Sequence, residues 1–139
     1  MKYRFVISTV VASLLFTAEI TVKVSGFENQ IGQAIIVLYN SNDDFPTIEN
    51  AFKAKTLPIG DEIASSFADI PEGVYCIAVY HDENKNGTLD MAWFPIPHPK
   101  EGFALSNNAT KKYLPPSFRK ASFGVKTEDN LVFELKIVY

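Results

Sequence analysis

The sequence predicts an all-β domain, an antiparallel β-sandwich of about seven short strands with a long loop region and at most one or two short helical turns. Alternation of apolar and polar residues near both ends of the chain is typical of half-buried strands. Two segments in the middle, 33–40 and 74–81, are apolar on both faces, as central strands are. The long stretch 82–108 is polar and proline-rich, and it shows neither the alternation of a strand nor the periodicity of a helix. Several short strands with one long excursion favour a sandwich.

The strand predictions follow the chain. Residues 19–25 place Ile20, Val22 and Val24 on one face, and residues 131–139 repeat this pattern. We expect 19–25 to pair with 33–40 as a hairpin. Further strands are predicted at 62–67, 74–81, 103–105 and 121–126.

The other segments carry turn and helix signals. Residues 47–55 can form two helical turns, with Thr47 as the cap and Pro58 beyond the end. Residues 69–73 are expected to form a tight turn and 115–121 one helical turn. The prolines at 95, 97 and 99 argue against regular pairing there.

The first eighteen residues have the pattern of a secretory signal. Lys2 and Arg4 precede the apolar run Phe5–Ala18, whose fourteen residues are too few to span a bilayer comfortably. We therefore expect residues 1–18 to be a signal peptide and 19–139 to be a single β-sandwich domain. The predicted protein is exported and has no membrane span after signal cleavage.

Charge and cysteine content exclude some partners. Without residues 1–18 the chain has 11 basic and 16 acidic residues, a net charge of −5. Nucleic-acid binding needs a basic patch, so we expect no nucleic-acid partner. The single cysteine, Cys76, cannot form an internal disulfide, and its apolar neighbours predict a buried side chain.

The segment that follows the strand 74–81 has the spacing of a calcium loop. Oxygen-bearing side chains occupy its first, third, fifth and ninth places, and Gly87 supplies the sharp turn. The twelfth place is Trp93 instead of the glutamate that an EF-hand requires, so the missing ligand is expected from outside the loop. The predicted Ca²⁺ ligands are Asp82, Asn84, Asn86, Thr88, Asp90 and Glu101. Such a site would be weak, with Kd on the order of 10⁻⁴ to 10⁻³ M. The alternative is that Asp and Asn here only form Asx turns with their own backbone.

Catalytic signals are sparse. His81 and His98 are the only histidines, and with Asp82 and Glu101 they could form a zinc or hydrolytic site. They lack zinc-ligand spacing, however, and no serine lies in a G-x-S-x-G setting. We predict no catalytic residue and a non-enzymatic binding or structural module. The alternative is a small periplasmic metal-dependent hydrolase that uses His81, Asp82 and Glu101.

Aromatic residues gather in the loop-rich half of the sequence: Trp93, Phe94, Phe103, Tyr113 and Phe118. They can form a ligand or partner surface, or they can close one end of the core. The predicted binding face consists of His81, Trp93, Phe103, Ser106, Asn107, Asn108 and Phe118. Its partner is expected to be an unknown protein or a small-molecule ligand.

The motifs HDENKNG, KEG, SNN and PSF, in this order, resemble a bacterial family catalogued as domain of unknown function 2141. The resemblance implies export to the periplasm or outer surface of a Gram-negative bacterium. It also implies an Ig-like sandwich similar to transthyretin-like or carboxypeptidase-regulatory-like domains, and it supplies no established activity. The chain departs from the expected pattern where Pro95 precedes Ile96 and where His98-Pro99 separates IP from KEG. The motif positions are His81, Asp82, Asn84, Asn86, Gly87, Asp90, Pro97, Glu101, Gly102, Ser106, Asn107, Asn108, Pro116, Phe118, Ala121 and Phe123.

Overall fold

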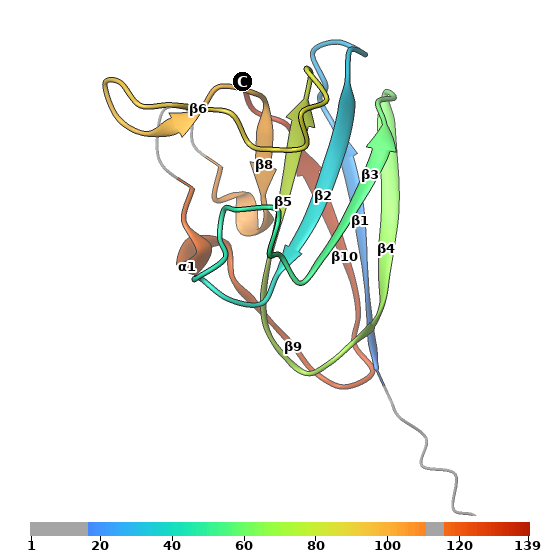
Figure 1. Ribbon diagram of the computed structural model, residues 1–139. Helices are drawn as coiled ribbons and strands as arrows, with labels where there is room; N and C mark the ends of the chain where they lie inside the picture. Colours follow the sequence, from blue (N-terminus) through green and yellow to red (C-terminus); the bar gives the residue numbers. More distant parts are fainter. Residues whose placement is uncertain (1–16, 111–115) are drawn as a thin grey trace, which may run out of the picture.

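Two β-sheets packed face to face form the molecule, in a computed structural model that describes residues 17–110 and 116–139 (Figure 1). This confirms the predicted β-sandwich. Most of the predicted signal segment, residues 1–16, lies outside the described residues. The elements in order are β1 (Ala18–Ser25), β2 (Gln33–Tyr39), β3 (Lys53–Pro58), β4 (Glu62–Ile70), β5 (Gly73–Asp82), β6 (Met91–Ala92), β7 (His98–Pro99), β8 (Phe103–Leu105), the 3₁₀ turn η1 (Ser106–Asn108), α1 (Phe118–Ala121), β9 (Phe123–Val125) and β10 (Asn130–Lys136). Within the described ranges no helix is long and apolar enough to cross a membrane.

The first sheet has the order β10-β1-β4, and the second has the order β3-β2-β5-β8 with β9 paired to the start of β5. β1 runs antiparallel to β4 and parallel to β10, so the first sheet is mixed. The predicted hairpin of 19–25 with 33–40 is therefore wrong. The connection between β1 and β2 carries the chain from one sheet to the other, and alternation specifies the buried face of a strand but not its neighbour.

The inner core lies between the two sheets. Ile20, Val22 and Val24 of β1 are fully buried there, as their alternation predicts. β2 and β5 contribute the alternate positions Ile36, Leu38, Ile77 and Val79, among others. The inner core thus fixes the face of the long strands, and β3, whose residues are mostly exposed, contributes the partly buried Leu57.

A second apolar layer, the outer cluster, covers the opposite face of β2 and β5. Its strand residues include Tyr39, Cys76 and Tyr80, and loop residues such as Phe45, Ile48, Leu89 and Phe118 pack on them. Cys76 is buried, as predicted, and burial raises the pKa of its thiol to about 12. These loops explain why both central strands are apolar on both faces.

The predicted helix at 47–55 is wrong. The chain instead makes turns, with Thr47 N–H donating to Asp44 O and Ala51 N–H to Ile48 O, and enters β3 at Lys53. Packing of Ile48 on the outer cluster and pairing of Lys53–Pro58 with β2 override the weak local helix preference.

Contacts between the sheets close both sides of the sandwich. On one side Phe103 and Val138 exchange backbone hydrogen bonds of 3.0 and 2.9 Å. On the other side Lys53 Nζ donates to Ala68 O at 2.9 Å, and Lys55 Nζ donates to Ser66 O. The lysine side chains cover the edges of β3 and β4, which protects sheet edges from pairing with another chain.

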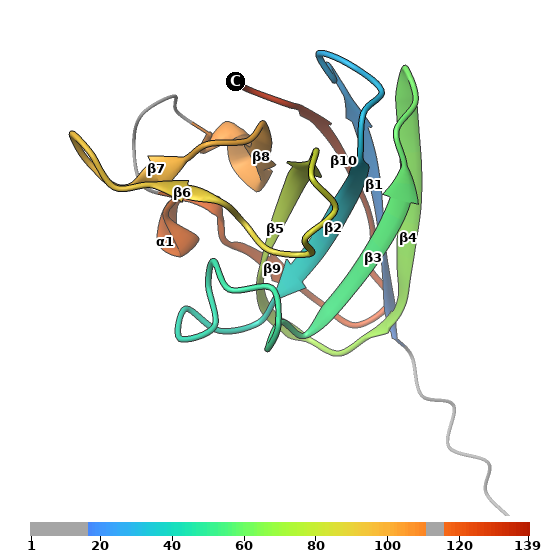
Figure 2. The same ribbon diagram turned by 45° about the horizontal axis from the view of Figure 1, so that its top comes forward.

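A short arm, residues 91–99, projects from the loop-rich side of the second sheet (Figure 2). Met91 pairs with Pro99 and Ala92 with His98, so the expectation of no regular pairing in this segment is wrong for these residues. Pro95 and Pro97 lie at the unpaired tip of the arm, where no ladder hydrogen bond is required. The predicted helical turn is present as α1, and the Ser117 side chain accepts a hydrogen bond from Lys120 N–H.

Candidate functional site

His81 lies near the end of β5 and is completely buried. Its Nδ1 is 2.6 Å from the Tyr139 hydroxyl, and its Nε2 is 2.7 Å from the Ile31 carbonyl oxygen. The rings of Phe27 and Tyr139 meet the imidazole edge-on, with centroids 5.4 and 5.9 Å away. Both ring nitrogens are therefore occupied by bonds that join β5 to two distant segments.

Asp82 follows as the first residue of the calcium-like spacing, and it is also fully buried. Its Oδ2 accepts hydrogen bonds of 2.9 Å from Gln33 Nε2 and from Gly87 N–H, and its Oδ1 accepts one of 3.2 Å from Asn86 N–H. Gly87 has a φ of 73°, which a residue without Cβ adopts readily. The carboxylate of Asp82 thus holds the loop in its sharp turn.

Asn84, Asn86 and Asp90 form a hydrogen-bonded group on the surface of the loop. Asn84 Nδ2 donates to Asp90 Oδ2 at 2.9 Å, and Asn86 Nδ2 donates to both Asp90 oxygens at 2.9 and 3.0 Å. These bonds lower the pKa of Asp90, with Asn86 as the largest cause. The side-chain oxygen of Asn84 accepts a hydrogen bond from the backbone N–H of Asn86, and that of Asn86 accepts one from the backbone N–H of Thr88. Both contacts are Asx turns.

Glu101 follows the arm by two residues, where the chain has come back beside the calcium-like loop. Burial, followed by the negative charges of Asp90 and Asp82, raises the pKa of Glu101 to about 7. Its Oε2 is buried without a hydrogen-bond partner. A hollow of about 420 Å³ lies beside it, lined by Glu83, Asn84, Asp90, Met91, Lys100 and Glu101. The structure thus brings Asp82, Asp90 and Glu101 into one electrostatic group.

The fit of these residues to calcium is partial. In the parts of the chain that the structure describes, no three His, Cys, Asp or Glu side chains form a group that could hold a metal ion. Ca²⁺ also takes amide and carbonyl oxygens, but Asn84 and Asn86 turn their nitrogens toward Asp90. Their amides would have to rotate, at the loss of two Asx-turn bonds, before their oxygens faced a cation beside Asp90.

The residues of the alternative hydrolytic site face in different directions. The His81 ring faces Tyr139, Ile31 and Phe27, whereas the Glu101 carboxyl is influenced by Asp90 and Asp82. His98, the other histidine, lies in the arm, where its Nδ1 contacts Ile96 O at 2.7 Å.

The SNN motif connects β8 to the segment around α1. Ser106 is buried, and its Oγ accepts Ile77 N–H at 3.0 Å and donates to Ala121 O at 2.5 Å. Asn107 Nδ2 donates to Ser122 O at 2.7 Å. This motif therefore pins the PSF segment, which contains Ser117 and Phe118, onto the outer cluster.

The residues of the predicted binding face occupy two environments. His81, Phe103 and Ser106 lie in the interior, and Phe118 is partly buried against the outer cluster. Trp93, Asn107 and Asn108 are exposed. Tyr113 of the aromatic group lies outside the described residues.

The most apolar exposed region is at the arm. Trp93 is 74% exposed and Phe94 87% exposed, and Ile96 lies between the two tip prolines. Next to it is an apolar groove of about 670 Å³ between the β2–β3 connection and the calcium-like loop. The groove is lined by Pro46, Thr47, Ile48, Glu49, Gly87, Thr88, Leu89, Met91, Trp93 and Pro116.

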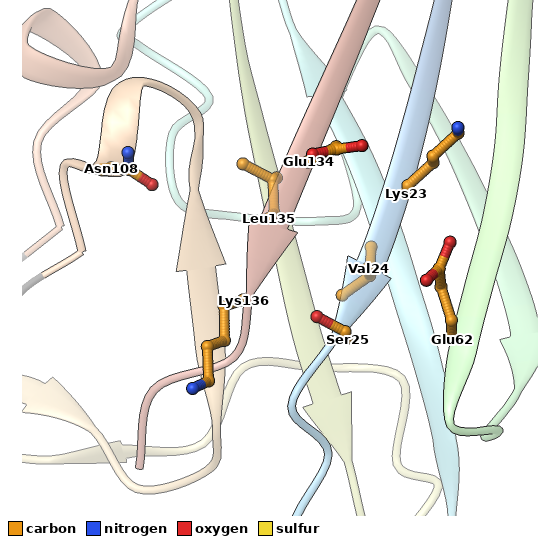
Figure 3. Close-up of a pocket in the computed structure, with 8 residues that line it drawn as sticks. All are labelled: Lys23, Val24, Ser25, Glu62, Asn108, Glu134, Leu135 and Lys136. Atoms are coloured by element: carbon orange, nitrogen blue, oxygen red, sulfur yellow. The ribbon is translucent and has the colours of Figure 1, made fainter.

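A smaller hollow, of about 280 Å³, lies over the first sheet (Figure 3). Lys23, Glu62 and Glu134 project there from adjacent strands, and Asn108 lies across from them. The charged side chains around this hollow alternate in sign, and its lining contains no histidine or cysteine. We therefore assign no reaction to this hollow. The lining residues are Lys23, Val24, Ser25, Glu62, Asn108, Glu134, Leu135 and Lys136.

Three partners of the motif residues were not foreseen from the sequence: Gln33, Ile31 and Tyr139. Gln33 stands opposite Asp82 in the β2–β5 register, so a correct strand pairing would have identified it. Nothing in the local sequence around Tyr139 or Ile31 indicates a contact with His81.

A family model described as "uncharacterized protein conserved in bacteria (DUF2141)" matches residues 22–132. Neither the curated proteins nor the solved structures contain a match.

Proposed function

The chain belongs to the domain of unknown function 2141 family, and we propose that it is an exported, non-enzymatic binding or structural module. One observation carries this proposal: the motif side chains best suited to catalysis are bonded into the fold. Both nitrogens of His81 are occupied, the Asp82 carboxylate accepts three hydrogen bonds, and the Ser106 hydroxyl bonds to backbone groups. A hydrolase built on His81 would have to break these bonds before its imidazole could act as a base or a ligand.

Export rests on the amino-terminal sequence. A charged start followed by a fourteen-residue apolar run in Phe5–Ala18 is typical of a secretory signal. The proposed location is the periplasm or the cell surface of a Gram-negative bacterium. Fractionation of cells that express the full chain tests this, because the exported form is expected to be shorter by about the length of the signal segment.

Calcium is proposed as a weak ligand of the loop. The negative charges of Asp90 and Asp82 act on the partly buried carboxyl of Glu101, and the buried Glu101 Oε2 has no hydrogen-bond partner. A divalent cation beside Asp90 would relieve the repulsion that raises the pKa of Glu101. The cost of rotating the Asn84 and Asn86 amides keeps the expected Kd on the order of 10⁻³ M.

A melting comparison in Ca²⁺ and in chelator tests the calcium site. At ten times Kd, binding to the native state alone stabilises by about 1.4 kcal/mol, a shift of about 5 °C for a domain of this size. Glu101→Gln is expected to abolish most of this shift, while Glu128→Gln, an exposed control on the β9–β10 turn, retains it. An unchanged melting temperature in wild type would remove calcium from the proposal.

Metal analysis of the purified protein separately tests the proposal that this protein is not an enzyme. We expect no tightly retained zinc. Stoichiometric zinc that survives dialysis, and that is lost in His81→Gln, would contradict the proposal and favour the metal-dependent hydrolase.

A further inference from the structure

The arm carries an exposed apolar tip, defined here as Trp93, Phe94 and Ile96. Trp93 is 74%, Phe94 87% and Ile96 39% exposed, and residues 91–99 contain no Asp, Glu, Lys or Arg. Isolated exposed apolar residues are normal, but three of them on one projecting, uncharged segment mark an interaction site. Figure 2 shows this segment extending away from the two sheets.

A concave apolar surface lies next to this convex one. The apolar groove described above contains Ile48, Leu89 and Met91, and Trp93 forms part of its rim. Its volume of about 670 Å³ is large enough for aromatic side chains. Tip and groove are thus complementary surfaces on the same side of one chain.

We propose that the arm tip of one copy of this chain binds in the apolar groove of a second copy, so that the protein forms a two-fold symmetric dimer. In a two-fold interface the same patch meets itself, and a chain with a tip beside a groove satisfies both contacts at once. The inference goes beyond the proposed function and depends on neither calcium nor export.

The area fits a weak but specific dimer. Aromatic side chains bury about 150–250 Å² each, so the exposed parts of Trp93 and Phe94 offer roughly 300 Å² per copy. Two tips and the two grooves that cover them would bury roughly 1,200 Å² in total, the lower limit for stable interfaces. We therefore expect a concentration-dependent dimer with Kd on the order of micromolar.

Charge favours a second copy over a membrane surface. Glu83, Asp90 and Glu101 line a hollow at the base of the arm, and their negative charge would oppose the anionic headgroups of a bilayer that the tip had entered. A bilayer would also leave the groove unfilled. The groove lining contains one charged residue, Glu49, so it presents a nearly uncharged surface to the uncharged tip.

Trp93 is the only tryptophan of the chain, so its fluorescence reports directly on the tip. The test uses the chain from Thr17 onward, which contains every strand of the structure. Sedimentation velocity and tryptophan emission are measured together from about 1 to 200 µM, a range that brackets the expected Kd. We expect the average mass to approach that of a dimer and the emission to shift to the blue over the same range.

Two variants separate the tip from the groove. Phe94→Ser removes one of the two aromatic rings of the tip, and Thr88→Arg places a long charged side chain at the groove from an exposed position. Each alone is expected to weaken dimerisation at least tenfold without changing the far-UV circular dichroism. An equimolar mixture of the two restores one intact tip–groove contact and should dimerise more strongly than either alone. Val132→Ser, at an exposed apolar residue of β10, is the matched control and should leave the dimer unchanged.

Three outcomes would overturn the proposal. The first is a wild-type monomer with constant emission at every concentration. The second is a dimer that neither Phe94→Ser nor Thr88→Arg weakens. The third is a blue shift that appears only on addition of vesicles of phosphatidylethanolamine and phosphatidylglycerol, which would assign the tip to a membrane surface. None of these outcomes bears on the calcium or zinc measurements.

Discussion

The Nδ1 atom of His81 lies 2.6 Å from the hydroxyl oxygen of Tyr139, and this bond ties the end of the central strand β5 to the last residue of the chain. The same hydroxyl accepts the Glu28 N–H at 3.1 Å. Burial raises the pKa of Tyr139, so the phenol stays protonated and available as a donor. His81 belongs to a motif whose residue types could bind metal or catalyse hydrolysis, but here it joins two segments that are distant in the sequence.

Replacement of Tyr139 by Phe is expected to destabilise the protein by about 1–3 kcal/mol, because it leaves a buried imidazole nitrogen unpaired. Urea unfolding at neutral pH measures the change as a lower midpoint with an unchanged slope. A loss below about 0.5 kcal/mol would show that the His81–Tyr139 bond contributes little to stability.

Gly102 is expected to tolerate no side chain. A Cβ there would lie 2.3 Å from the Tyr139 ring and 2.6 Å from Ile137 Cγ2, closer than packed atoms approach. Gly102→Ala should therefore cost about 1–3 kcal/mol through overpacking. Gly124→Ala is the control, since a Cβ at Gly124 meets nothing within 4 Å. Equal effects of the two substitutions in thermal unfolding would contradict the packing seen around Tyr139.

Stability in chelator is expected to fall as pH rises from about 4.5 to 7, because of Glu101. The pKa of this carboxyl is raised from 4.5 to about 7 in the folded protein, first by burial and then by Asp90 and Asp82. The folded state then binds more protons than the unfolded state in this window, so deprotonation favours unfolding.

Glu101→Gln isolates this effect. The variant should lose the decline between pH 4.5 and 7 relative to wild type, and it should be the more stable of the two above pH 7. Midpoints of urea unfolding at several pH values measure the decline and the difference in stability between the two proteins. Parallel pH profiles for the two proteins would show that Glu101 does not titrate in this range.

Much of the architecture followed from alternation and apolar runs. Ile20, Val22 and Val24 are fully buried, and β5 is central, as expected from its two apolar faces. A strand that is apolar on both faces must be covered on both. One face of β5 packs in the inner core, and loops that carry residues such as Phe45 and Phe118 cover the other. Strand order was not predictable, because alternation identifies a buried face but not the partner strand.

The candidate site was predictable as a segment but not as a set of contacts. Spacing correctly placed Asp82 and Gly87 in one sharp loop turn. The burial of His81 and Asp82 depends on Tyr139, Ile31 and Gln33, which lie 49 to 58 residues away along the chain. Only the tertiary fold brings such partners together, so local motifs could not separate a ligand from a structural residue.

Amide hydrogen exchange of Asn86 and Gly87 in chelator shows whether the buried Asp82 orders this loop through its own hydrogen bonds. Because the Asp82 carboxylate accepts both N–H groups, we predict that both amides are protected without Ca²⁺. Asp82→Ala should abolish that protection, while amides in the middle of β5 remain protected. Exchange of Asn86 and Gly87 at the rate of an unstructured chain in chelator, with protection only in Ca²⁺, would show that the metal and not Asp82 orders the loop.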